Sequence, residues 1–70
     1  MTREQWAALA RLAQKYGPII AMGKADDLKH DDGTPVKGWY WVTLPDPMWF
    51  DYDEDARRGF YITPAGRVHA

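Results

Sequence analysis

The first sixteen residues alternate between apolar and polar side chains with the period of an α-helix. At about 100° per residue, the apolar positions fall within one arc of about 120° and the charged positions lie on the other side. The apolar arc consists of Trp6, Leu9, Leu12, Ala13 and Tyr16. Thr2 can cap the first turn, and Gln5 three residues later completes a capping box. Gly17 and Pro18 then stop the element. The pattern therefore predicts a helix from Arg3 to Tyr16.

After the proline the pattern changes to that of short strands separated by turns. Apolar and β-forming runs, bounded by proline, glycine and aspartate, predict three to five strands. They are Ile19 to Met22, Gly38 to Leu44, Met48 to Tyr52, Phe60 to Thr63 and Arg67 to His69. The polar stretch from Lys24 to Lys37 reads as a long loop with room for one helical turn near Asp26 to His30. Asp53 to Gly59 reads as an exposed turn.

This order of elements predicts a single α+β domain over residues 1–70, with the N-terminal helix on one face of a small antiparallel sheet. The strands form a meander that ends in a C-terminal hairpin. Because strand side chains alternate between faces, the strand residues sort into two sets. One set is almost wholly apolar: Tyr40, Val42, Leu44, Met48, Phe50, Tyr52, Phe60, Ile62 and Val68. We expect it to form the core, because the other set would bury Asp51 and Arg67 without partners.

The second face of the predicted sheet is rich in large aromatic residues: Trp39, Trp41, Trp49 and Tyr61. A single helix cannot cover both faces, and tryptophan and tyrosine are enriched at binding hot spots. Three interpretations follow. In the first, the loop from Lys24 to Lys37 covers the patch, or the core face and the outer face of the sheet are the reverse of those assigned above. Alternatively, a protein partner or a second copy binds there. In the third, single-stranded nucleic acid stacks on the rings.

Composition narrows these interpretations. The chain has no cysteine, so disulfides and thiolate metal sites are excluded, and its ten aromatic residues must supply much of the core. A net charge of −1 disfavours tight nonspecific binding to nucleic acid. The charge is uneven, because residues 26–55 carry nine acids and two bases. The acidic turn, formed by Asp51, Asp53, Glu54 and Asp55, could steer a basic protein toward the aromatic patch.

Residues for catalysis or for holding a metal are not recognisable. The chain has neither serine nor cysteine, and its threonines suit cap, turn and strand positions. The acidic turn begins like a calcium loop, but Ala56 replaces the required glycine and Ile62 the required glutamate. We therefore predict no catalytic residue, no metal and no cofactor. No apolar run approaches the roughly 20 residues of a membrane span, and the N-terminus lacks a signal peptide, so we expect a cytoplasmic protein.

Three features of the sequence carry a resemblance to a known group of proteins. They are the opening from Met1 to Leu9, the Tyr16-Gly17 pair, and the pattern of use of alanine, arginine, aspartate and tryptophan. The chain resembles the small accessory proteins of tailed phages and prophages, among them anti-defence proteins. The resemblance covers the whole chain without a diagnostic motif, and it assigns no site residue. It implies a non-enzymatic protein that binds a host protein and inhibits or modulates it in the host cytoplasm. The alternatives are a single-stranded nucleic-acid binder and a structural homodimer.

Overall fold

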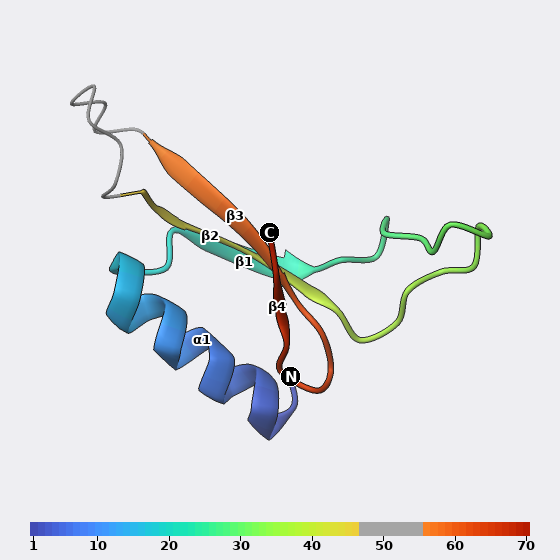
Figure 1. The fold of residues 1–70 in the computed structure, drawn as a ribbon, viewed down its shortest axis with the longest axis horizontal. Coiled ribbons are helices and arrows are strands. Elements are labelled where there is room, and N and C mark those ends of the chain that lie inside the picture. Colours follow the sequence, from blue (N-terminus) through green and yellow to red (C-terminus); the bar gives the residue numbers. More distant parts are fainter. Residues whose placement is uncertain (47–55) are drawn as a thin grey trace.

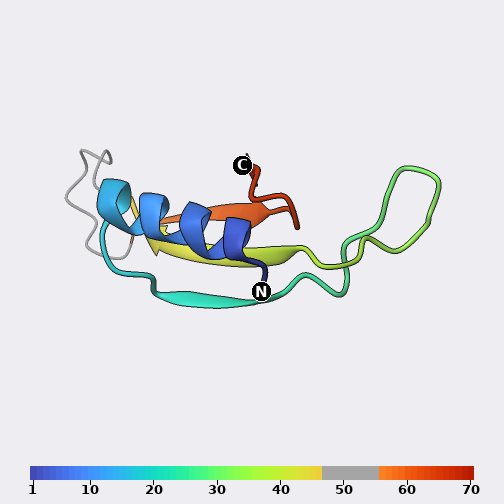
Figure 2. The same ribbon diagram turned by 90° about the horizontal axis from the view of Figure 1, so that it is seen from below.

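A computed structural model of the protein describes residues 1–46 and 56–70. Its elements are α1 (Arg3–Tyr16), β1 (Ala21–Lys24), β2 (Tyr40–Pro45), β3 (Arg57–Ile62) and β4 (Val68–His69). The strands form one antiparallel sheet in the order β1-β2-β3-β4. Helix α1 lies along one face of this sheet (Figures 1 and 2). The predicted α+β class, with the helix on one sheet face, is therefore confirmed. Within the described ranges, no helix has the length and apolar character needed to cross a membrane.

Both ends of α1 follow the predicted signals. The Gln5 backbone N–H donates to the Thr2 hydroxyl at 3.1 Å, and the Thr2 N–H donates to the Gln5 side-chain oxygen at 2.7 Å. These two bonds form the capping box. At the other end Gly17 has a φ of 110°, which residues with a side chain rarely adopt. The predicted helix, Arg3 to Tyr16, is confirmed at both boundaries.

The buried side of α1 is rotated about the helix axis relative to the predicted buried side. Its buried members are Gln5, Ala8, Leu9 and Leu12. Trp6 was expected in the core, but 57% of its surface is exposed, so that prediction is wrong. The reason is that Gln5 donates its amide N–H groups to the carbonyls of Gly38 at 2.6 Å and Ile62 at 3.4 Å. A fully hydrogen-bonded amide can be buried, and placing it under the sheet turns Trp6 toward solvent.

The strand boundaries differ from the predicted ones by one to three residues, most clearly at the starts of β1, β2 and β3. β1 starts two residues later than predicted, and β2 begins at Tyr40 rather than Gly38. β3 begins at Arg57, so the end of the predicted turn from Asp53 to Gly59 is strand. In each case pairing with the neighbouring strand sets the boundary, which local propensity does not fix. The predicted strand from Met48 to Tyr52 lies outside the described residues.

The β1–β2 connection, residues 25–39, forms an extended arm. It contains no helix, and where one helical turn was expected near Asp26 to His30 there is a single hydrogen-bonded turn, in which the Leu28 N–H donates to the Ala25 carbonyl at 3.3 Å. Its two legs meet at a bridge between Lys29 and Pro35, and the Val36 N–H donates to the Leu28 carbonyl at 3.0 Å. At the tip, hydrogen bonds from Thr34 lower the pKa of Asp32 and hold the turn. Figures 1 and 2 show the arm projecting beyond the end of the sheet.

The core lies between α1 and the inner face of β2 and β3. Its buried members are Ala8, Leu9, Leu12, Val42, Leu44, Phe60 and Ile62. The predicted assignment of faces is thus confirmed for these β2 and β3 residues. Val68 was also expected in the core, but it is 38% exposed. That prediction is wrong because β4 is an edge strand of two residues, and the core residues of the sheet come from β2 and β3.

Candidate binding face

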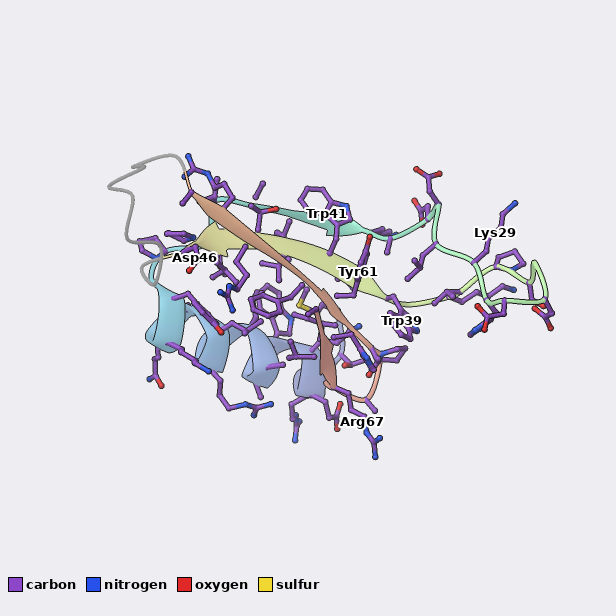
Figure 3. All side chains as sticks on the ribbon, turned by 45° about the horizontal axis from the view of Figure 1, so that its top comes forward. Lys29, Trp39, Trp41, Asp46, Tyr61 and Arg67 are labelled. Carbon is purple, nitrogen blue, oxygen red and sulfur yellow. The ribbon has the colours of Figure 1, made fainter. Side chains whose placement is uncertain are left out.

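The sheet face turned away from α1, called here the outer face, carries the candidate site. Cross-strand register aligns Gly23, Trp41, Tyr61 and His69 in one row across all four strands. Directly opposed residues of antiparallel strands point to the same side, so the row shares the outer face. Figure 3 shows Trp41 and Tyr61 on the side of the sheet opposite α1. Each has 36% of its surface exposed.

The Trp41 indole is held in place by the glycine beside it. A Cβ atom built on Gly23 would lie 2.8 Å from the indole ring, so the ring rests directly against the β1 backbone. Only glycine leaves room for this approach. Tyr61 flanks Trp41 on the other strand. The ring is therefore packed between neighbouring strands and still presents part of its surface to solvent.

Trp39 and His69 extend the aromatic row. Their rings stack with centroids 5.4 Å apart and an interplanar angle of 25°. This contact leaves Trp39 half-buried. His69 was not among the predicted site residues. The alternation of side chains along the predicted terminal hairpin assigned His69 to this face. Its position beside Tyr61 depends on the register of β3 and β4, which the sequence does not fix.

A shallow hollow of about 200 Å³ adjoins the two exposed rings. Trp41 and Tyr61 form one side of it, and the other side comes from β1 and the base of the arm. Two carboxylates, Asp26 and Asp27, line this side together with Lys24. Acidic groups thus stand beside the aromatic rings, although they come from the arm rather than from the predicted acidic turn.

The structure brings three of the predicted site residues, Trp39, Trp41 and Tyr61, onto one face. The arm borders this face at its base but leaves Trp41 and Tyr61 exposed, so it does not cover them. The other predicted site residues lie outside the described ranges: Trp49, Asp51, Asp53, Glu54 and Asp55.

The hollow on this face is lined by the Trp41 and Tyr61 rings together with Lys24, Asp26 and Asp27. In the described part of the chain, no group of three or more histidine, cysteine, aspartate or glutamate side chains is placed to hold a metal ion. Comparison of the chain with protein-family models, curated proteins and solved structures gives no match. Packed aromatic rings beside carboxylates in an open hollow can bind an apolar or cationic surface by contact.

Proposed function

We propose that the protein is a non-enzymatic protein-binding module that contacts its partner through the outer face. The observation that carries this proposal is the pair formed by Trp41 and Tyr61, two adjacent rings that are packed yet 36% exposed. Large aromatic residues dominate binding hot spots because they contribute much contact area. Rings that are already held lose little conformational freedom on binding.

Charge around the rings supports a partner with a basic surface. Asp26 and Asp27 line the hollow beside them. Complementary charge mainly speeds association and selects among partners. The resemblance to phage accessory proteins supports a host protein as the partner, and inhibition or modulation as the result of binding.

Truncation of the exposed rings tests the proposal. A partner is first captured from a bacterial lysate, identified and purified, and its affinity is then measured by calorimetry. Trp41→Ala and Tyr61→Ala should each weaken binding about 30-fold or more, as expected for hot-spot residues. Trp6→Ala is the matched control, because it removes a more exposed indole from α1. Wild-type affinity in both folded outer-face variants would rule out this face as the contact.

A second candidate function is the stacking of single-stranded nucleic acid. The charge on the β-strands of the outer face favours this function. Arg57 shares the outer side of β3 with Tyr61, and no described β-strand residue on that side is acidic. Aromatic platforms with a nearby cation are typical of proteins that bind single strands without sequence preference.

Titration with short single-stranded oligonucleotides separates the two candidates. Stacking should quench tryptophan fluorescence in the wild type, less so in Trp41→Ala, and the effect should weaken as salt is added. A protein-directed face should give no response at any oligonucleotide concentration. Quenching with these two properties would favour the nucleic-acid function over the proposed one.

A further inference from the structure

The rings of Trp41 and Tyr61 are not occupied by any lysine or arginine of the chain itself. Two cations lie over a ring in the described part of the chain, Lys15 and Arg58, and both lie over Tyr16 of α1. Residues 47–55, outside the described ranges, contain no lysine, arginine or histidine. The face of an aromatic ring carries negative charge and attracts a cation. The two exposed rings can therefore accept a cation that comes from another molecule.

Two carboxylates stand beside these rings without a partner among the described residues. Asp26 and Asp27, at the base of the arm, line the same hollow as the rings. Both are exposed, and neither side chain forms an ion pair or a hydrogen bond within the described ranges. By contrast, the Asp46 carboxylate accepts from Arg58 at 3.2 Å. The hollow thus offers two carboxylates to a cationic group.

The basic residue that lines the hollow, Lys24, directs its side chain away from the rings. Lys24 is opposite Tyr40 in the register of β1 and β2, and opposed residues point to the same side of a sheet. Tyr40 lies two residues before buried Val42, so this is the helix side. The rings leave the sheet on the other side, where the two aspartates set the charge.

The size and chemistry of the hollow suit one arginine side chain. Its volume of about 200 Å³ is below the roughly 300 to 1,000 Å³ of pockets that bind small molecules. A guanidinium group is planar and weakly hydrated, so it stacks on aromatic rings and donates paired hydrogen bonds to a carboxylate. The ammonium group of lysine is a strongly hydrated point charge and matches this combination less well.

We propose that the hollow receives one arginine side chain of the partner protein. The guanidinium plane lies against the exposed surface of Trp41 and Tyr61, which sit on neighbouring strands near the start of the arm (Figure 3). Its N–H groups donate to the carboxylates of Asp26 and Asp27. This inference rests on the proposed function and deepens it, because it names the chemical group that the outer face recognises.

Nuclear magnetic resonance on the full chain tests the assignment with three tripeptides, each blocked at both ends. They carry arginine, lysine or citrulline between two glycines; citrulline replaces the guanidinium with a neutral urea group of similar shape. We expect the arginine peptide to shift the Trp41 indole N–H signal, identified by its loss in Trp41→Phe, with a dissociation constant of about 1 to 10 mM.

The other two peptides decide whether the guanidinium is the group that binds. The lysine peptide should bind about threefold or more weakly, and the citrulline peptide about tenfold or more weakly. Added salt should weaken binding of the arginine peptide, because part of the attraction is between exposed charges. The proposal is overturned if no saturable shift occurs, or if either comparison peptide binds as tightly as the arginine peptide.

A pair of double variants tests the two carboxylates. Asp26→Asn combined with Asp27→Asn should raise the dissociation constant of the arginine peptide about tenfold or more, because both charged acceptors are lost. Glu4→Gln combined with Asp31→Asn is the matched control, since it removes two exposed carboxylates that do not line the hollow. It should change the constant less than twofold, and circular dichroism establishes that both proteins fold. Equal weakening in the two proteins would show attraction by overall charge alone and would overturn the proposal.

The peptide experiment separates this inference from the proposed function. If the arginine peptide fails to bind while Trp41→Ala still weakens binding of the purified partner, the arginine site is wrong and the proposed function stands. If the peptide binds as expected while both ring variants keep wild-type affinity for the partner, the proposed function is wrong and the arginine site stands.

Discussion

Leu44→Ala should destabilise the protein by about 3 kcal/mol or more, because it opens a cavity in the centre of the core. Leu44 has no exposed surface and packs in the cluster between α1 and the sheet. A core of a 70-residue chain rarely provides more than about 3 to 5 kcal/mol in total. We therefore expect a variant that is largely unfolded at room temperature, as measured by urea denaturation and circular dichroism.

Val68→Ala is the matched control for this substitution. It shortens a side chain that belonged to the same apolar set in the sequence but is exposed on β4. Its cost should stay within about 0.5 kcal/mol, the range of ordinary surface changes. A large loss of stability in Val68→Ala together with a small one in Leu44→Ala would contradict the packing described above.

Gln5→Leu should cost about 2 to 4 kcal/mol, although it replaces a polar residue in the core with an apolar one of similar size. The substitution removes the capping-box bond to Thr2, a contribution of about 1 kcal/mol. It also leaves the Gly38 and Ile62 carbonyls without their side-chain donor, which costs about 1 to 3 kcal/mol where the carbonyl is buried. Denaturant unfolding with an unchanged slope would measure the loss.

Gln5→Glu separates the two roles of this residue. Glutamate preserves the capping box, since its carboxylate can accept the Thr2 N–H. It cannot donate to the two carbonyls while ionised, and burying the charge is unfavourable. Burial raises the pKa of such a carboxyl, so stability should be lowest near neutral pH and should recover as the pH falls and the group becomes protonated. Wild-type stability at neutral pH would mean that Gln5 acts only as a cap.

The packing of the outer face depends on one residue of β1, Gly23. Its missing side chain makes room for the Trp41 indole on the outer face, where a Cβ atom would lie 2.8 Å from the ring.

Local chemistry in the sequence determined the helix and the assignment of the sheet faces. The Thr2–Gln5 pair and Gly17 act within a few residues of the helix ends, so α1 could be predicted to the residue. The alternation along β2 and β3 likewise identified Val42 and Ile62 as core residues, because a strand buried on one side must alternate.

The tertiary structure decided everything that depends on contacts between distant residues. Gln5 is buried and Trp6 exposed because carbonyls 33 and 57 residues away accept from the glutamine amide. The position of Trp41 over Gly23, and of His69 beside Tyr61, follows from strand register. A shift of register by one residue would leave the composition unchanged yet reverse which side chains meet. The candidate face is therefore visible in the sequence as a set of residues, but its geometry is set by the paired strands.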